Sequence, residues 1–203
     1  MLEPGDHVWY WDGRTSQELA IPQALWFPGF QGPTDYQGNG KDIFNFVIYD
    51  NEIARGQPHM RNFPGSYAWL NNNPGNLTGQ PGGPDFGQYP GKFNWHNFLI
   101  FPSWDAGFAA IALLLRGPKY VNLSILDAFK RYAPASDGND PVRYAQDVAA
   151  AIGVSDSTVV GDLDDDQLLA MQNKIQDIEG AVSGETLDFD SPELPEALTA
   201  LLS

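Results

Sequence analysis

The chain has 203 residues, 42% of them hydrophobic, and it contains no cysteine. This length suits a single domain that buries its own core, and the lack of cysteine excludes disulfide bonds, a thiol nucleophile and a cysteine-based zinc site. Acids outnumber bases 26 to 11, which gives a net charge of −15. That charge argues against binding to nucleic-acid phosphates or to an anionic membrane surface. No apolar run approaches the roughly 20 residues that a membrane span needs.

The negative charge is concentrated towards the C-terminal end, where residues 131–203 hold 15 acids and 3 bases. A solvent-exposed helical face accounts for this excess. The alternative, a calcium loop at Asp164, Asp165 and Asp166, lacks the alternating oxygen ligands, the central glycine and the closing glutamate of such a loop. At the other end, the first eleven residues show neither the basic start nor the apolar stretch of a cleavable signal peptide.

The first half of the chain is rich in glycine, proline and aromatic residues. Residues 1–40 are expected to form an extended arm or linker with several turns. Residues 42–52 are expected to form a helix, because Phe44, Ile48 and Glu52 recur at a spacing of four on one face.

Little helix is expected between residues 53 and 103. The sequence there predicts a turn-rich loop at residues 71–76 and a small β-hairpin made of residues 92–93 and 98–101. A further short strand is expected near the N-terminus, at residues 8–11.

Well-marked helices follow in the second half, where capping residues precede the helices and glycine or proline follows them. They are expected at residues 104–116, 124–132, 141–152, 165–179 and, as a short terminal helix, 191–201. The chain as a whole therefore predicts a mostly α (α+β) fold with a small β lobe.

Glu52 is a carboxylate at the end of an otherwise apolar stripe. Burial beside apolar groups disfavours the charged form of a carboxyl, so we expect its pKa to be raised. A carboxylic acid that is still protonated near neutral pH can donate a proton to a leaving oxygen. Glu52 is therefore a candidate general acid, and the alternative is a surface residue at a frayed helix end.

Cleavage of a glycosidic bond usually needs a second carboxylate across the sugar from the acid. Asp85 is the one acidic residue between Glu52 and Asp105, and it is the candidate for this role. The alternative is that Asp85 builds the turn Pro84–Gly87.

Sugars are recognised by flat aromatic faces together with amide donors and acceptors. The segment from residue 67 to residue 89 is rich in both kinds of side chain. Its candidate substrate-binding residues are Tyr67, Trp69, Asn71, Asn72, Asn73, Asn76 and Tyr89. For each asparagine, the alternative is a role in building turns.

Other chemistries find little support in the sequence. The histidines His7, His59 and His96 are dispersed and show no metal-binding spacing, so no metal site is expected. The chain contains neither a nucleophile elbow nor a glycine-rich phosphate loop, and no cofactor is expected.

The order of segments resembles the lysozyme-like superfamily of cell-wall glycosidases. A helix ending at Glu52 is followed by WLNNNPGNL (residues 69–77), by a hairpin that ends in FLIFPS (98–103), and by a helix that begins WDAGFAA (104–110). The chain looks most similar to muralytic domains of phage virion proteins and type VI secretion effectors. The resemblance covers roughly residues 42–150.

This resemblance implies a lysozyme-like fold, with a cleft between a helical lobe and a small β-hairpin lobe. Together with the composition of the two ends, it predicts an arm or linker at residues 1–40, a lysozyme-like catalytic domain at 41–182 and an acidic tail with a short helix at 183–203. It further implies a glycoside hydrolase of muramidase type that cleaves the β-1,4 bonds of peptidoglycan. Glu52 would be its general acid, and the asparagine loop would line the cleft.

The family does not fix the second carboxylate, and lytic transglycosylases work without one, so transglycosylation is an alternative to hydrolysis. Another alternative is a non-catalytic wall-binding or phage structural module of the same fold. The strong negative charge suits an antibacterial effector that is secreted or delivered into the periplasm of a target cell, or alternatively a protein displayed on a virion. The expected partners are the glycan strands of peptidoglycan and an immunity protein or secretion component, without nucleic acid or membrane insertion.

Overall fold

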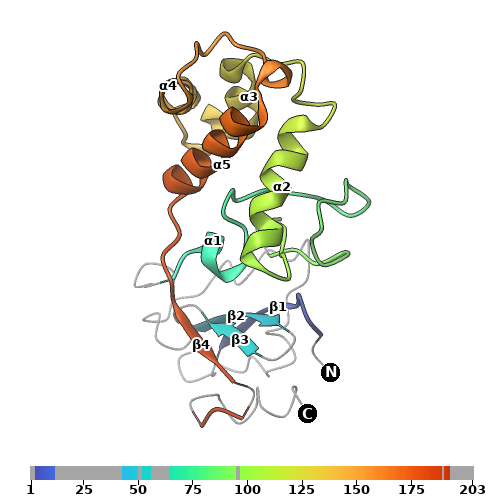
Figure 1. The fold of residues 1–203 in the computed structure, drawn as a ribbon. Helices are drawn as coiled ribbons and strands as arrows, with labels where there is room; N and C mark the ends of the chain where they lie inside the picture. The colour runs from blue at the N-terminus through green and yellow to red at the C-terminus, as the bar shows by residue number, and fades with distance from the viewer. Residues whose placement is uncertain are drawn as a thin grey trace. The chain divides into compact units, whose positions relative to one another are not determined.

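The computed structural model describes residues 3–11, 43–49, 52–55, 65–94, 97–188 and 190–192. Among these residues the structure is mostly helical, with few strands and no barrel (Figure 1). The chain divides into two compact units. The first unit comprises Met1–Gly107 and Ala181–Ser203, and the second unit comprises Phe108–Gly180.

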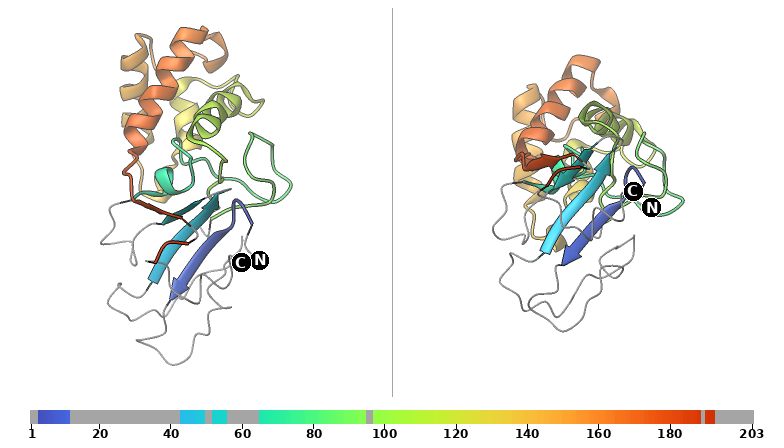
Figure 2. Two further views of the ribbon diagram at one scale, coloured as in Figure 1. Left: turned by 60° about the horizontal axis from the view of Figure 1, so that its bottom comes forward. Right: turned by 90° about the horizontal axis from the view of Figure 1, so that it is seen from below.

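The first unit contains a four-stranded antiparallel sheet, which Figure 2 shows from two further sides. Its strands are β1 (His7–Trp11), β2 (Ile43–Tyr49), β3 (Glu52–Arg55) and β4 (Glu185–Leu187), in the spatial order β1-β2-β3-β4. The strand expected at residues 8–11 is thus confirmed. Strands β2 and β3 form a tight hairpin in which Tyr49 lies opposite Glu52.

The expected helix at residues 42–52 is wrong, because this segment supplies β2 and the first residue of β3. Val47, Ile48 and Tyr49 are consecutive and all buried, so both faces of the end of the strand are covered. A strand covered on both faces does not alternate between apolar and polar residues. Its continuous apolar run therefore matched a helical spacing by coincidence.

Beyond the sheet, the first unit holds one short helix and two isolated bridges among its described residues. Helix α1 (Tyr67–Leu70) was not expected, and Ser66 caps it by accepting a hydrogen bond from the amide of Trp69. The expected hairpin at residues 92–101 is reduced to the single antiparallel bridge between Phe93 and Leu99.

The longer helices lie where the sequence predicts them. They are α2 (Trp104–Arg116), α3 (Ile125–Tyr132), α4 (Pro141–Ile152) and α5 (Asp165–Glu179). The caps are confirmed as well. Ser124 accepts from the amide of Asp127, Asp140 precedes α4, and Gly153 ends α4 at φ 73°. The expected terminal helix at residues 191–201 lies almost wholly outside the described residues.

In the second unit, α3 packs against α4 and α4 packs against α5. The larger buried side chains of this unit are less than 4% exposed and include Ile111, Leu115, Ile125, Phe129, Val148, Val160, Leu163, Met171 and Ile175. Among the residues that the structure describes, no helix combines the length and hydropathy that a membrane crossing requires.

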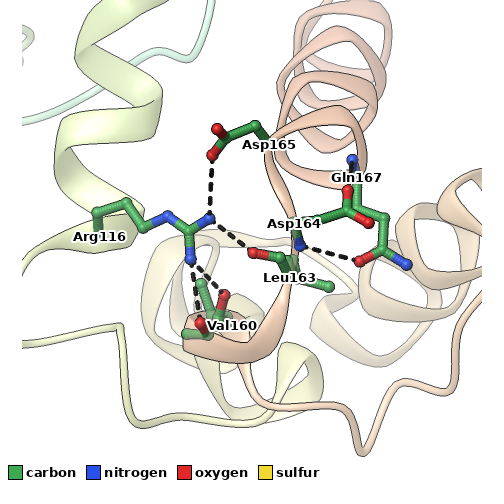
Figure 3. A network of polar contacts seen from close by, with 7 residues as sticks. Arg116, Val160, Leu163, Asp164, Asp165 and Gln167 are labelled. Atoms are coloured by element: carbon green, nitrogen blue, oxygen red, sulfur yellow. Dashed lines mark hydrogen bonds and ion pairs between the residues drawn. The ribbon is translucent and has the colours of Figure 1, made fainter.

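Arg116, the last residue of α2, fixes the turn that precedes α5 (Figure 3). Its guanidinium donates to the carbonyl oxygens of Val160 at 3.3 Å, Gly161 at 3.2 Å and Leu163 at 2.7 Å. The carboxylate of Asp165 lies farther away, at 3.8 Å. The planar guanidinium can serve several acceptors at once because its donors are arranged as a rigid fork.

The boundaries of the two units differ from the expected division into residues 1–40, 41–182 and 183–203. One boundary falls inside α2, between Gly107 and Phe108, and β4 brings part of the expected tail into the sheet beside β3. Strand β1 likewise places part of the expected arm in that sheet. The division into an arm, a catalytic domain and a tail stays a prediction.

Candidate functional site

The asparagine loop, residues 71–77, follows α1 directly and is held by unusual backbone conformations. Asn72 and Asn76 have φ values of 49° and 47°, in the left-handed region that asparagine tolerates better than most residues. The side-chain amide of Asn72 donates to the carbonyl of Phe101 at 3.3 Å. The backbone conformation and this hydrogen bond therefore explain why asparagine stands at these positions, independently of the predicted role in substrate binding.

Asn73 is completely buried and its side chain is fully hydrogen-bonded. Its Nδ2 donates to the carbonyls of Leu77 at 2.9 Å and Leu99 at 3.0 Å, and its Oδ1 accepts from the amide of Leu77 at 2.9 Å. This side chain closes the loop on itself and attaches it to the returning segment at Leu99. The geometry therefore gives Asn73 a structural role.

Asn71 is also completely buried, but its side chain has a different environment. Neither Oδ1 nor Nδ2 has a hydrogen-bond partner among the described residues. Leaving a buried polar group without a partner costs about 1–3 kcal/mol, and such groups in native proteins call for an explanation. The backbone of Asn71 is well anchored, since its carbonyl accepts from the amide of Phe101 at 2.9 Å.

A hydrogen bond connects the β2–β3 hairpin to the residue that precedes this loop. The hydroxyl of Tyr49 donates to the carbonyl of Leu70 at 2.5 Å, and Leu70 immediately precedes Asn71. Tyr49 lies opposite Glu52 in the antiparallel register. The backbone of Glu52 is therefore paired with the same residue, Tyr49, whose side chain is hydrogen-bonded to the residue before the asparagine loop. Its side chain lies outside the described part of the structure.

The first turn of α2 packs closely on the same loop. A Cβ atom added to Gly107 would lie 1.8 Å from the carbonyl oxygen of Asn72 and 2.9 Å from the ring of Pro74. Only glycine permits this approach between the helix and the loop backbone. Gly107 was not among the site residues expected from the sequence, although an isolated glycine inside a helical pattern is a signal of close packing.

The three candidate aromatic residues pack against a buried cluster of the first unit. Tyr67, Trp69 and Tyr89 are half-buried and pack against the buried cluster of Val47, Tyr49, Leu70 and Ile100. The ring of Tyr67 also lies 5.9 Å from the ring of Phe98, and the ring of Tyr89 lies 6.4 Å from that of Tyr49. The structure thus brings these three aromatic residues and the asparagine loop together in one region of the first unit.

Asp85 lies in an exposed turn. Its Oδ1 accepts a hydrogen bond from the amide of Gly87 at 2.8 Å, and the neighbouring amide of Phe86 is bound by the side chain of Gln88. This is the local geometry of an aspartate that builds a turn. A role as second carboxylate stays a prediction.

An ion pair that was not expected from the sequence holds the N-terminal segment. Lys92 Nζ contacts Asp6 at 2.6 Å and Glu3 at 3.2 Å, and Asp6 is only 4% exposed. Burial lowers the pKa of Lys92, but the hydrogen bonds and charges of Asp6 and Glu3 outweigh burial and raise the pKa above its usual value. The described residues contain no group of three histidine or acidic side chains that could hold a metal ion.

Comparison with models of protein families, with curated proteins and with solved structures finds no match to this chain. Its function must therefore be argued from the geometry of the first unit.

Proposed function

We propose that the chain is a peptidoglycan glycosidase whose general acid is Glu52. The observation that supports this proposal is the hydrogen bond from Tyr49 to the carbonyl of Leu70. It joins the hairpin that contains Glu52 to the loop that begins at Asn71. The proposed acid and the proposed amide-rich binding loop are thereby parts of one local structure.

The proposed reaction starts with transfer of the Glu52 proton to the glycosidic oxygen as the bond from that oxygen to the sugar C1 breaks. The oxocarbenium-like sugar then reacts with water, and a proton from this water returns to the Glu52 carboxylate. Asp85 is the candidate to stabilise the positive sugar or to activate the water. Without such a partner, the N-acetyl group of the sugar attacks C1 instead.

The lysozyme-like form of the fold belongs to this proposal. One difference from the resemblance is clear, because Glu52 begins a strand rather than ending a helix. A raised pKa was expected for Glu52 because of its place on a helical stripe, and the strand removes that reason. A general acid at this position needs another contact that stabilises its protonated form.

The charge of the chain bears on where it would act. A net charge of −15 repels an anionic cell wall over distances of roughly 8–10 Å at physiological salt. Delivery into a periplasm, as by a type VI secretion system, avoids approach through such a wall. In that setting the additional partner is an immunity protein or a secretion component.

The deciding experiment is digestion of purified peptidoglycan by the full chain, with the products identified by mass spectrometry. Glu52→Gln should reduce cleavage roughly 100-fold or more, the scale of general acid catalysis. Asp177→Asn removes one negative charge from an exposed position on α5 and serves as the matched control with unchanged activity. Cleavage by Glu52→Gln at the rate of the unmodified chain would refute the assignment.

The products also separate the alternatives within the proposal. A reducing-end sugar indicates hydrolysis, and an anhydro sugar indicates transglycosylation. If Asp85→Asn retains activity while Glu52→Gln does not, the second role belongs to the N-acetyl group of the substrate or to another acid of the chain. Binding to peptidoglycan without any product would assign the chain to wall-binding modules.

A further inference from the structure

Two turns of the first unit share one residue pattern and lie against each other. Residues 3–6 read EPGD, and residues 89–92 read YPGK. In each turn the amide of the last residue donates to the carbonyl of the first, at 3.0 and 3.2 Å respectively. The glycines in third position have φ values of 83° and 70°. Proline in second position followed by glycine at positive φ is typical of type II turns.

The contact between the two turns is made by a glycine and an aromatic side chain. A Cβ atom added to Gly5 would lie 2.6 Å from Cγ and 2.7 Å from Cβ and Cδ2 of Tyr89, so the backbone of Gly5 packs directly on the ring. The amide of Gly5 donates to the carbonyl of Ile48 at 2.7 Å, and the amide of Tyr89 donates to the carbonyl of Ile100 at 2.8 Å. The ring is therefore held between two anchored segments of backbone.

The ion pair of Lys92 joins the same two turns. Lys92 is the last residue of its turn, and its Nζ lies 2.6 Å from Asp6 Oδ1 and 3.2 Å from Glu3 Oε2. The side chain of Asp6 is only 5% exposed. Removing a carboxylate from water has a desolvation cost that offsets much of the attraction, so such a pair adds little net stability. What this pair supplies is a fixed position of the turn at residues 3–6 relative to Tyr89.

We propose that the turn at residues 3–6 is a positioning element for glycan binding, in which Gly5 holds the ring of Tyr89 as a stacking platform for a sugar of the substrate. Tyr89 is half-buried, so part of this residue remains accessible. A flat aromatic face suits the apolar face of a sugar ring. A side chain that is already fixed loses less conformational freedom on binding, which strengthens the interaction.

This inference rests on the proposed function and places one of its binding residues. The ring of Tyr89 lies 6.4 Å from the ring of Tyr49, and Tyr49 pairs with Glu52 in the antiparallel register. Paired strands lie about 4.8 Å apart. A sugar stacked on Tyr89 would therefore lie in the same part of the first unit as the backbone of Glu52.

The test is a double-mutant cycle of Gly5→Ala and Tyr89→Leu in the full chain. Both changes are made together with Glu52→Gln, so that soluble glycan fragments of peptidoglycan are bound but not cleaved, and calorimetry gives the dissociation constant. Gly5→Ala should raise this constant roughly 3- to 10-fold, the scale of one aromatic contact, because the new methyl group displaces the ring. Tyr89→Leu should weaken binding to a similar extent, and Gly5→Ala should then add nothing, because the ring that it displaces is gone.

Gly82→Ala is the matched control. Gly82 holds the third position of a similar turn, residues 80–83, and has a φ of 74°, but a Cβ atom there would meet nothing within 4 Å. Both alanine variants bear the strain of a left-handed backbone, so both should have a lower melting temperature, whereas binding should weaken in Gly5→Ala alone. Equal binding by the two variants, or an effect of Gly5→Ala that persists in Tyr89→Leu, would overturn the positioning role.

Lys92→Met tests the same role from the other turn and covers the case in which Gly5→Ala does not fold. It leaves the buried carboxylate of Asp6 without its cation, so the turn at residues 3–6 loosens and binding should weaken. Lys92→Arg keeps the charge and should bind more tightly than Lys92→Met. Unchanged binding in Lys92→Met would overturn the role of the ion pair.

Failure of the proposed function gives a different result. If the chain without substitutions yields no cleavage products while Gly5→Ala and Tyr89→Leu remain coupled in binding, the glycosidase is refuted and the positioning role stands. If Glu52→Gln alone abolishes cleavage while the two changes act independently on binding, the glycosidase stands and the positioning role is refuted.

Discussion

Because Gly107 has no Cβ atom, the first turn of α2 can pack directly against the backbone of the asparagine loop. The helix α2 rests on the asparagine loop at a distance that leaves no room for a Cβ atom, which would meet the carbonyl oxygen of Asn72 at 1.8 Å. The helix and the loop approach each other here through their backbones, and backbone atoms cannot rotate away as a flexible side chain would. The contact therefore ties the position of the loop to the identity of residue 107.

Gly107→Ala is expected to lower the free energy of unfolding by about 1–3 kcal/mol, because the added methyl group overpacks the contact. Alanine is otherwise the better helix former by about 1 kcal/mol. Ala109→Gly, at an exposed position of the same helix, is the matched control and should cost about that amount. Urea denaturation measures both, and a more stable Gly107→Ala would contradict the close approach.

The asparagine loop also shows which residue roles a sequence can reveal. Its turn-forming character follows from local residue preferences, and it was predicted. The contrast between Asn71 and Asn73 depends on Leu99 and Phe101, which return to the loop from later in the chain. Local reasoning does not reach such partners, so both asparagines looked alike in the sequence.

Helix ends were predicted well because their determinants lie within a few residues of one another. Ser124 with Asp127 and Asp140 with Arg143 are bonds across three positions. The β2–β3 hairpin was missed although β3 follows β2 directly, because β2 is covered on both faces and its apolar run therefore shows no strand alternation. The β-branched and aromatic side chains of residues 43–49 favour a strand, in competition with their helical spacing.

The turn before α5 depends on a contact of this non-local kind. Arg116→Met should lower the free energy of unfolding by about 1–3 kcal/mol, because three carbonyl oxygens lose a charged donor. Arg116→Lys should recover part of the loss, since an ammonium cannot reproduce the planar fork. Both are measured by urea denaturation followed by circular dichroism.

Asp165→Asn is the matched comparison for Arg116. Asp165 is fully exposed and 3.8 Å from the guanidinium, and exposed ion pairs contribute little to stability, so Asp165→Asn should have a smaller effect than Arg116→Met. A larger effect of Asp165→Asn than of Arg116→Met would show that the ion pair, rather than the carbonyl contacts, fixes the turn.

The second unit contains an aromatic cluster that links stability to pH. Phe129 stacks on Tyr144 at 4.5 Å between ring centres, and Tyr144 donates to Glu179 at 2.8 Å. Burial raises the pKa of Tyr132 well above its usual value, and the charge of Glu179 raises it further. Burial likewise raises the pKa of Tyr144, followed by the influence of Tyr132 and Glu179.

These shifts predict a loss of stability in alkali. Above about pH 10 the phenols ionise in the unfolded chain but stay protonated in the folded one, so rising pH favours unfolding. Each of Tyr132 and Tyr144 should lower the free energy of unfolding by about 1.4 kcal/mol per pH unit in that range. Urea denaturation at a series of pH values from about 9 to 11 measures the slope.

Tyr144→Phe provides the control for this prediction. It should remove about 1.4 kcal/mol per pH unit from the slope while costing about 1 kcal/mol at neutral pH through the lost hydrogen bond to Glu179. A slope that is the same in Tyr144→Phe and in the unmodified chain would contradict the raised pKa of Tyr144.

The division into two units also separates the natural fluorophores of the chain. All six tryptophans precede Phe108 and so belong to the first unit, whereas the second unit has Tyr120, Tyr132 and Tyr144 and no tryptophan. Light absorbed by indole alone therefore reports on the first unit, whereas tyrosine emission comes from both units. The unfolding of the first unit can thus be followed separately in the unlabelled chain. A glycan that covers Trp69 would shift the wavelength of the tryptophan emission maximum, so binding could be detected without a chemical label.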